Sequence, residues 1–511
     1  MRQETMDSDV IIIGAGLLGC FMARNLRKYN LTVQVIEKAP DVCTGISKAN
    51  TGIIYPGYDM ATGSLKARLT VKACREFPAL CETLGVPFNP CGSLMVGFGP
   101  NGKKSIENKY EKGIANGVTG LELLDPGQCL ALEPSLAPDV LIGLYSPDTC
   151  TVNPWDLCIA GYENAVANGA SFIFDTEVTD IKRLQENGQQ LFSVFIKKNM
   201  DLGKTPSDTI ASDASSRGHL TCRCLINCAG MSSALVHEML STPSIRLNPT
   251  GADYFILEED PAQMPGHVIF HEPEEKGKGL TIIPTVDHNT MVGPTERDNP
   301  DLIGTPTKAD ELSFLKEHCH KYLPAMPTEH IIHTFGSARP NPFEVIPENG
   351  TWVRSKKRLS DFNILEEDGF FNLIGVKTPG LTCCNVLGEY IADKVVSHLG
   401  NVTENPDYNP HRTAPIRVHA LSLEERSTYI QKDPAYGRII CSCRDISEAE
   451  IQSAIRRGAH TLDGVKRRCG VLMGQCQGSR CLKKVLEIMA DEMGCSVNEI
   501  PKEARSAYIL R

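Results

Sequence analysis

The sequence lacks any run of about 18 consecutive apolar residues, the length that a membrane-spanning helix requires. It also lacks an excess of positive charge, because 52 Lys and Arg stand against 62 Asp and Glu. A net charge of −10 argues against general nucleic-acid binding and against electrostatic attachment to an anionic membrane surface. The opening residues MRQETMDSD contain no apolar segment typical of a secretory signal, so we expect a cytoplasmic location.

Cysteine, by contrast, is plentiful, with 20 residues in a chain of 511. Secreted disulfide scaffolds concentrate cysteine in short chains, so this usage predicts mostly reduced, buried thiols in a reducing compartment. Contents of 41% hydrophobic and 22% charged residues are ordinary for a globular protein. The length exceeds what one hydrophobic core usually serves, which predicts two or three domains.

A βαβ unit is expected at the N-terminus. The apolar run DVIIIG ends at Gly14, a helical stretch begins at Leu17, and a second strand, TVQVIE, ends at Glu37. Gly14, Gly16 and Gly19 form a GxGxxG motif at the turn, where glycines allow a tight turn, close approach to a pyrophosphate and close helix packing. The motif alone is weak, but its position and a carboxylate about 20 residues later predict dinucleotide binding.

Two later segments favour FAD over NAD. LINCAG is an apolar strand ending at Ala229 and Gly230, as in flavoproteins whose second half closes over the nucleotide. NLIGVKTPGLT leads into a helical stretch, and we expect Thr378 to be its N-cap with Pro379 in the first turn. A helix starting there would direct its positive end at the flavin. The alternative is a helix that serves packing alone.

Several ordered blocks carry a family resemblance. They are DVIIIGAGLLG, SKANTGIIYPGY followed by GSLKARL, LINCAG, GKGLTIIPTV with MVGPTERD, FGSARP, and NLIGVKTPGLT. The chain resembles the D-amino-acid-oxidase-like superfamily of FAD-dependent oxidoreductases over nearly its whole length. Within it, the chain is most similar to anaerobic-type glycerol-3-phosphate dehydrogenases and to their L-2-hydroxyglutarate-oxidising relatives.

The resemblance implies a set of FAD-binding residues and one substrate-binding residue. Arg339 would meet the anionic group of the substrate; the alternative is an ordinary ion pair. Tyr55 stands where many relatives have histidine, which leaves the catalytic base open. The implied cofactor-binding residues are Gly14, Gly16, Leu17, Gly19, Glu37, Lys38, Ser47, Lys48, Asn50, Thr51, Gly52, Val178, Ala229, Gly230, Gly375, Thr378, Gly380, Leu381 and Thr382.

The expected architecture is α/β. A Rossmann-like FAD-binding domain (about 7–95, 145–240 and 360–400) is interleaved with an α+β antiparallel-sheet substrate lobe (about 96–144 and 245–358) within residues 1–410. A linker at 411–430, a small helical domain at 431–495 and a tail at 496–511 follow. We expect the polar segment 204–220 to be a surface insertion and the proline-rich RPNPFEVIPENG to be irregular.

Four cysteines near the C-terminus have metal-ligand spacing. Cys441 and Cys443 form C-x-C, and Cys476 and Cys481 form C-x4-C after a long gap. Ser447 and Glu450 predict a capping box that starts one helix between these pairs, which Gly458 would end. Ser479 is expected to cap a second helix, which Gly494 would close, with Cys476 and Cys481 at its entrance.

Four thiolates select zinc or an iron–sulfur cluster. Zinc sites more often use C-x(2–4)-C pairs. The pattern resembles the bacterioferritin-associated-ferredoxin-like 2Fe–2S domain, in which Cys469 would be a non-ligand. Zinc and an empty, degenerate domain remain the alternatives.

The two domains together predict an FAD-dependent dehydrogenase that passes electrons through a 2Fe–2S cluster to a protein or quinone-linked acceptor. Its expected substrate is a small anionic alcohol, with glycerol 3-phosphate as the first candidate and an L-2-hydroxy acid as the second. An amine or imino acid is the third candidate. A flavin and iron–sulfur electron-transfer module without substrate chemistry is the alternative from another class. No nucleic-acid partner is expected.

Overall fold

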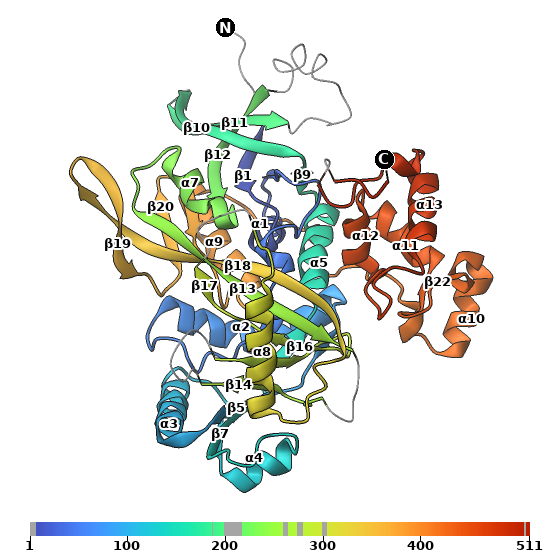
Figure 1. Ribbon diagram of the computed structural model, residues 1–511. Coiled ribbons are helices and arrows are strands. Elements are labelled where there is room, and N and C mark those ends of the chain that lie inside the picture. The colour runs from blue at the N-terminus through green and yellow to red at the C-terminus, as the bar shows by residue number, and fades with distance from the viewer. Residues whose placement is uncertain are drawn as a thin grey trace.

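The computed structural model describes residues 7–186, 188–198, 217–258, 264–272, 279–298, 304–504 and 507–510. Two large sheets and a small helical C-terminal region make up the chain (Figure 1). Among the described residues, no helix combines the length and apolar character needed to cross a bilayer. All twenty cysteines are described, and each is a free thiol.

The first sheet has a parallel centre in the order β9-β2-β1-β12-β21. Two antiparallel strands, β10 and β11, extend it beside the first half of β12, and β20 pairs with β21. Its strands are β1 (Ser8–Ile13), β2 (Val33–Ile36), β9 (Ser171–Ile173), β10 (Thr176–Glu186), β11 (Gln189–Lys198), β12 (Arg217–Asn227), β20 (Asn363–Glu367) and β21 (Phe370–Ile374).

Three helices cover this sheet: α1 (Leu17–Leu26), α5 (Pro154–Ala167) and α9 (Cys384–Leu399). Their apolar side chains share one core with β1 and β2, in which Phe21 and Leu157 are buried. The predicted βαβ unit is confirmed: strand, helix and second strand fall where the apolar pattern places them. Helices α2 (Leu65–Leu84) and α7 (Ser233–Glu238) also pack on this half.

The second sheet has the order β19-β18-β13-β16-β15-β14-β5-β7-β6, with β17 beside β13. All its pairs are antiparallel except β5 with β14, so the antiparallel lobe expected around HVIFHEP, LTIIPTV and NTMVGPT is confirmed. Its strands are β5 (Ser93–Gly97), β6 (Glu122–Leu124), β7 (Ile142–Ser146), β13 (Ile245–Leu257), β14 (Val268–His271), β15 (Thr281–Pro284), β16 (Thr290–Gly293), β17 (Arg297–Asp298), β18 (Ile331–Glu348) and β19 (Thr351–Arg358).

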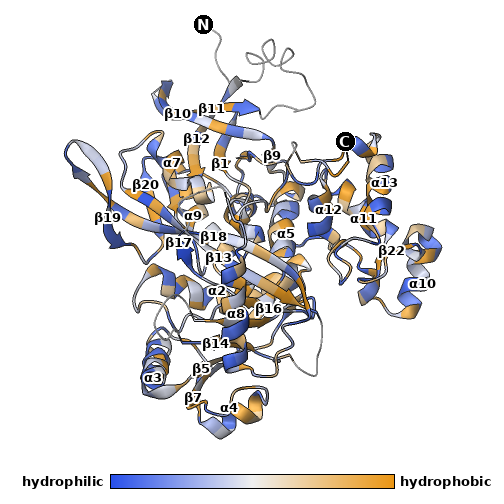
Figure 2. Ribbon diagram, viewed as in Figure 1, coloured by the Kyte–Doolittle hydropathy of each residue, from blue (hydrophilic) through white to orange (hydrophobic). Residues whose placement is uncertain are grey.

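Helices α3 (Gly99–Ala115), α4 (Pro126–Leu132) and α8 (Ala309–Tyr322) cover this lobe. A separate three-stranded sheet has the order β3-β8-β4, with β3 (Ile53–Ile54), β8 (Cys150–Val152) and β4 (Phe88–Asn89). Apolar residues concentrate in the strands of both sheets, whereas β19 and α3 are largely hydrophilic (Figure 2).

The prediction that RPNPFEVIPENG is irregular is wrong, because most of it lies in the long strand β18. Pro340 lies opposite Pro249 of β13, so the two residues without N–H groups face each other. β19 pairs with β18 only from Phe343 onward, so within the described part of the chain the other side of Pro340 has no strand partner. Prolines are tolerated at such places because no ladder hydrogen bond is lost.

Of the expected insertion at 204–220, residues 204–216 lie outside the described part of the chain, and 217–220 are not an insertion but the start of β12. The segment expected as a linker, 411–430, is extended only at its start, since helix α10 (Leu423–Lys432) occupies its second half. A capping box between Ser422 and Glu425 starts this helix. This local pattern could have predicted the helix, but the segment is polar, which favours a linker.

The C-terminal region has its own apolar core, built from α11 (Glu448–Arg456), α12 (Leu462–Cys469) and α13 (Leu482–Met493), with the short pair β22 (Ile439–Cys441) and β23 (Ile446–Ser447). The predicted capping box of Ser447 and Glu450 is present, and Gly458 and Gly494 follow the ends of α11 and α13 with positive φ. Ser479 does not cap α13; the N-cap position is Cys481.

Candidate functional site

The glycine turn after β1 leaves no room for side chains. Gly14 has φ +103°, and a Cβ there would lie 2.6 Å from the carbonyl oxygen of Cys228. A Cβ on Gly19 would lie 1.8 Å from the carbonyl oxygen of Gly14. The strand, the turn and α1 therefore pack as closely as a dinucleotide fold requires, and the backbone at the start of α1 can approach a ligand.

The N-terminus of α1 meets a second loop. Its N-cap, Gly16, has no side chain with which to cap the helix. The N–H of Leu17 donates instead to Oγ of Ser47 at 3.0 Å. A Cβ on Gly16 would lie 2.9 Å from the same Oγ. Helix N-termini attract anions, so the 46–48 turn and the start of α1 together form a cradle that fits the pyrophosphate of a dinucleotide.

Glu37 lies beside this cradle at the end of β2. Its Oε2 accepts the N–H of Ala15 at 2.7 Å, and its Oε1 accepts the N–H of Ala39 at 2.9 Å. Burial raises the pKa of Glu37, although these backbone hydrogen bonds oppose the shift. A carboxylate has about four acceptor positions, so it retains capacity for ribose hydroxyls. Lys38, the next residue, is exposed.

The segment 47–52 is held from several sides. Asn50 Nδ2 donates to the carbonyl of Ser47 at 2.8 Å, and its Oδ1 accepts the N–H of Gly52 at 3.0 Å. The indole Nε1 of Trp155 donates to the carbonyl of Lys48 at 2.8 Å. Thr51 hydrogen-bonds Tyr55. The loop is thus a fixed wall beside α1.

The parallel strands β12 and β21 end next to the glycine turn. Asn227 donates to Asn372 Oδ1 at 2.9 Å, which joins the two strand ends, and Ala229 and Gly230 follow after Cys228. Val178 is buried near the end of β2, in a core shared with Ile36. Ligands of such sheets bind at the carboxyl ends of the strands, where these residues gather.

Residues 375–382 form turns between β21 and α9. The prediction that Thr378 caps the helix is wrong, because α9 begins at Cys384 after the N–H of Gly380 closes a turn on the carbonyl of Lys377 at 2.5 Å. Gly375 has φ +66° and packs against β18. Thr382 is buried, and its Oγ1 accepts the N–H of Tyr55 at 3.0 Å, while Leu381 packs on the main core.

Arg339 lies on β18, opposite Thr250 of β13. Because directly opposite residues share a face, Ser337 and Tyr254 lie on the same face as Arg339. Ser337 Oγ donates to the carbonyl of Ala49 at 2.5 Å, which turns this face toward the 46–52 loop. The sheet therefore presents Arg339 to the dinucleotide site.

The guanidinium of Arg339 is fixed in place, but not all of its N–H groups have hydrogen-bond partners among the described residues. It hydrogen-bonds Tyr254, and its electrostatic influence also reaches Tyr55. Its Nη1 forms a long ion pair, 3.9 Å, with Glu296 Oε2, as the alternative to substrate binding requires, but this buried Nη1 has no hydrogen-bond partner among the described residues. An unsatisfied buried donor is costly, and an anionic ligand would satisfy it.

Further positive charge lies on the same face. Asn341 Oδ1 accepts hydrogen bonds from Lys377, at 2.7 Å, and from Arg358. Its Nδ2 donates to Thr250 Oγ1 at 3.0 Å. Tyr254, Asn341 and Lys377 were not predicted from the sequence, since only the strand register places them beside Arg339. Together with Arg339 they suit a small anion.

The four C-terminal cysteines form two thiol pairs. Cys443 hydrogen-bonds Cys476, and Cys441 hydrogen-bonds Cys481. Among the described residues, no three His, Cys, Asp or Glu side chains converge on a single metal position. Thiolates are ligands both of structural zinc sites and of iron–sulfur clusters, and these four cysteines are the residues that would hold either group.

The loop around Cys476 stabilises a thiolate. The N–H of Arg480, helped by Cys443, the N–H of Gly478 and the hydroxyl of Ser479, lowers the pKa of Cys476 to about 7. Ser479, predicted as a helix cap, thus binds the thiol instead. Burial and the neighbouring Cys441 raise the pKa of Cys481 to about 11.

The same loop is close-packed: a Cβ on Gly474 would lie 2.3 Å from Cβ of Cys443. Cys469 belongs to α12 rather than to this loop. Its thiol donates to the carbonyl of Val465 at 3.3 Å, and burial raises its pKa to about 12. The loop and the paired thiols therefore fit a cluster, with Cys469 as a packing residue.

The family profile of FAD-dependent oxidoreductases matches residues 9–394, and that of the BFD-like [2Fe-2S] binding domain matches residues 439–491. The chain belongs to the FAD-dependent oxidoreductase family. Over 508 residues it is 34% identical to a glycerol 3-phosphate dehydrogenase of Caloramator mitchellensis, with 98% of both chains covered. It is 24% identical to one component of the anaerobic glycerol-3-phosphate dehydrogenase of Escherichia coli, over 94% of this chain and 87% of that one.

Solved structures share the fold. The L-alpha-glycerophosphate oxidase of Mycoplasma pneumoniae with FAD bound has a TM-score of 0.67 at 23% identity, over 80% of this chain and 99% of that one. The glycerol-3-phosphate dehydrogenase of Bacillus halodurans complexed with FAD has a TM-score of 0.62 at 17% identity, over 97% and 92%. The predicted fold, family and enzyme class are confirmed. The individual site residues and domain boundaries stay predictions.

Proposed function

We propose that this protein oxidises glycerol 3-phosphate with bound FAD and delivers the electrons, through a 2Fe–2S cluster on Cys441, Cys443, Cys476 and Cys481, to a protein or quinone-linked acceptor. The observation that carries the proposal is the buried, unsatisfied Nη1 of Arg339, on a face that the sheet turns toward the dinucleotide site. The full-length similarity to a glycerol 3-phosphate dehydrogenase supports the same conclusion.

The chain's own residues bind and orient the substrate. Arg339, with Lys377 nearby, would bind the phosphate, and Tyr254 fixes the guanidinium. Burial raises the pKa of Tyr55 far above neutrality, so its hydroxyl keeps its proton and is not the base that accepts the substrate's. Tyr55 would instead orient the substrate through a hydrogen bond.

Bound FAD supplies two-electron oxidation of the carbon that bears the hydroxyl, and the cluster supplies one-electron transfer onward. Gly14, Gly16, Leu17, Gly19, Glu37, Ser47 and the 50–52 segment would hold the nucleotide, and residues 375–382 would lie beside the flavin ring. The predicted cytoplasmic location remains part of this proposal.

The test is an anaerobic substrate panel with the purified holoprotein. Glycerol 3-phosphate should bleach the visible absorbance of the flavin, and the cluster should then give an electron paramagnetic resonance signal. If neither phosphates, hydroxy acids nor amines bleach the flavin, the protein is an electron-transfer module and the dehydrogenase proposal is wrong.

L-2-hydroxyglutarate is the second candidate substrate. The chain is 28% identical over 335 residues to the L-2-hydroxyglutarate dehydrogenase of Nematostella vectensis, which covers 63% of this chain and 71% of that one. A guanidinium binds a carboxylate as well as a phosphate. Comparing kcat/KM for the two substrates decides between them.

A further inference from the structure

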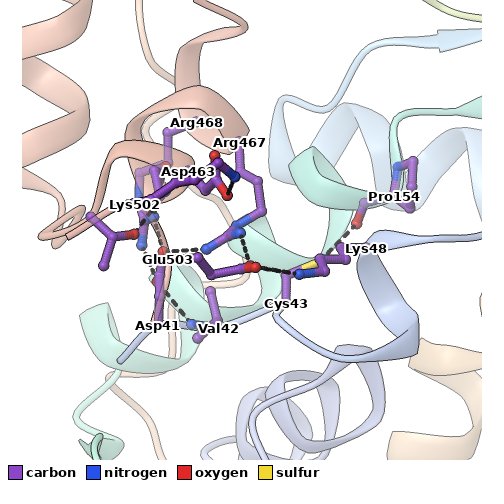
Figure 3. Close-up of polar contacts among 12 residues, drawn as sticks. Asp41, Val42, Cys43, Lys48, Pro154, Asp463, Arg467, Arg468, Lys502 and Glu503 are labelled. Carbon is purple, nitrogen blue, oxygen red and sulfur yellow. Dashed lines mark hydrogen bonds and ion pairs between the residues drawn. The ribbon is translucent and has the colours of Figure 1, made fainter. Parts of the chain in front are cut away.

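A chain of buried and partly buried charges joins the C-terminal region to the dinucleotide half (Figure 3). Asp41 follows β2 and is 1% exposed. Its Oδ2 lies 2.6 Å from Nη1 of Arg468 and 3.3 Å from Nη2 of Arg467, and its Oδ1 accepts a hydrogen bond from Arg468 Nη2 at 2.8 Å. Both arginines belong to α12, so this ion pair spans the two regions.

The chain of charges continues into the C-terminal tail. Nη1 of Arg467 lies 2.8 Å from Glu503 Oε1. Nζ of Lys48 lies 2.6 and 2.7 Å from the two carboxylate oxygens of Glu503. We call Asp41, Lys48, Arg467, Arg468 and Glu503 the clamp.

Lys48 belongs to the dinucleotide cradle, and Asp41 is connected to the glycine turn beside it. Two residues after Asp41, the N–H of Cys43 donates to the carbonyl of Ala15, within the glycine turn, at 3.2 Å. Lys48 is adjacent to Ser47, which accepts the N–H of Leu17 at the start of α1. A movement of α12 or of the tail would therefore be transmitted to the cradle.

The charges of the clamp do not balance. It contains three positive and two negative side chains, all of them buried or partly buried. Burial opposes the charge on Arg468, but Asp41 and the carboxylate of Glu163, which lies outside the clamp, raise the pKa of its guanidinium overall. Lys48, one of the three positive residues, belongs to the loop that meets the N-terminus of α1, where an anionic phosphate is expected to bind.

We infer that the clamp couples FAD binding to docking of the cluster domain, with Glu503 as the positioning residue that holds Lys48 and the 46–52 loop. The inference rests on the proposed function in one respect, that FAD binds at α1. Coupling between two binding equilibria is reciprocal. FAD must therefore strengthen docking of the cluster domain by the same factor by which docking strengthens FAD binding.

The test is titration of the full-length, cluster-loaded apoflavoprotein with FAD, followed by quenching of FAD fluorescence. Glu503→Gln should raise the dissociation constant about tenfold, the effect of losing one charge-assisted contact. Lys502→Gln is the matched control. Lys502 is the neighbouring tail residue, but its Nζ pairs with Asp463 Oδ2 at 2.7 Å, within the C-terminal region. The dissociation constant of FAD from Lys502→Gln should therefore differ from that of the wild type by less than twofold.

Two further variants separate positioning from general damage to the tail. Glu503→Asp keeps the charge and should recover most of the affinity. Lys48→Met should weaken FAD binding. Adding Glu503→Gln to this variant should lower the affinity for FAD little further, because both changes break the same contact between Lys48 and Glu503. Additive losses in the double variant would overturn the coupling.

Docking is measured independently by trypsin cleavage between residues 411 and 422. Arg412 and Arg417 there pair with Glu163 and Asp156 across the boundary, each at 2.6 Å, so cleavage requires undocking. FAD should slow cleavage of the wild-type protein, and it should do so less in Glu503→Gln. Equal FAD affinity and equal protection in both proteins overturn the inference, whereas a wild-type protein that binds no FAD overturns the proposed function itself.

Discussion

Ser47 and Leu17, thirty residues apart in the chain, are joined by a 3.0 Å hydrogen bond from the helix N–H to the serine hydroxyl. Through this contact the 46–52 loop closes on α1, and the loop is also bound by Trp155, Ser337 and Glu503. The dinucleotide cradle is therefore assembled from every large part of the chain, and each contribution can be tested separately.

Gly19→Ala should weaken FAD binding at least tenfold and lower stability by about 1–3 kcal/mol, because the new methyl group would lie 1.8 Å from the carbonyl oxygen of Gly14. Gly45→Ala is the control, since a Cβ there meets nothing within 4 Å. FAD titration and thermal unfolding measure both effects. Similar affinities of the two variants would show that close packing at Gly19 does not shape the site.

Arg339→Ala should lower kcat/KM for glycerol 3-phosphate by about ten- to a hundredfold, since a hydrogen bond to a charged group contributes about 1.5–3 kcal/mol. Arg339→Lys should give an intermediate value, because lysine keeps the charge without the planar fork. Arg354→Ala, on the exposed strand β19, is the control. Unchanged kinetics of Arg339→Ala would remove this residue from the substrate site.

Cys476→Ser should abolish the electron paramagnetic resonance signal of the reduced cluster and lower bound iron, while glycerol 3-phosphate still bleaches the flavin. Cys469→Ser should retain the signal, because Cys469 is a packing residue whose thiol bonds the backbone of its own helix. Iron and zinc analysis of the wild-type protein completes the test. Zinc in place of iron, or a signal that survives in Cys476→Ser, would contradict the assignment.

Arg468→Met should lower the free energy of unfolding at pH 7 by about 3 kcal/mol, the lower end of the range for breaking a buried ion pair, because it leaves the buried carboxylate of Asp41 only its longer contact, 3.3 Å, with Arg467. Burial raises the pKa of Asp41, but Arg468 and Arg467 outweigh burial and lower it overall. The ion pair therefore contributes its full stability above the ordinary aspartate pKa of about 4 and loses it as the pH falls through the lowered value.

The gap in stability between wild type and Arg468→Met should accordingly narrow below about pH 4. Arg456→Met is the control: its guanidinium is exposed, and a surface ion pair such as the one it forms with Glu492 contributes about 0–1 kcal/mol. Denaturant unfolding across this pH range measures both variants. A gap that stays constant with pH would mean that Asp41 does not titrate in this range.

Local signals predicted much of the fold. The apolar run before Gly14 and the β-branched second strand predict the βαβ unit, and Ser447 with Glu450 predicts the start of α11. The same kind of reasoning was wrong at Thr378 and Ser479. Both residues have the chemistry of a cap, but one lies in a turn before its helix and the other hydrogen-bonds a thiol.

What the sequence alone determined was the set of short-range units: a glycine turn between strand and helix, helix caps, and the two cysteine pairs with their spacing. Their geometry depends on neighbours along the chain, so local chemistry is enough to predict them. The tertiary structure alone decided that Pro340 fits a strand opposite Pro249, that Tyr254 lies beside Arg339, and that Glu503 reaches Lys48. These contacts depend on strand register and domain packing, which bring together residues far apart in the sequence and which no local pattern encodes.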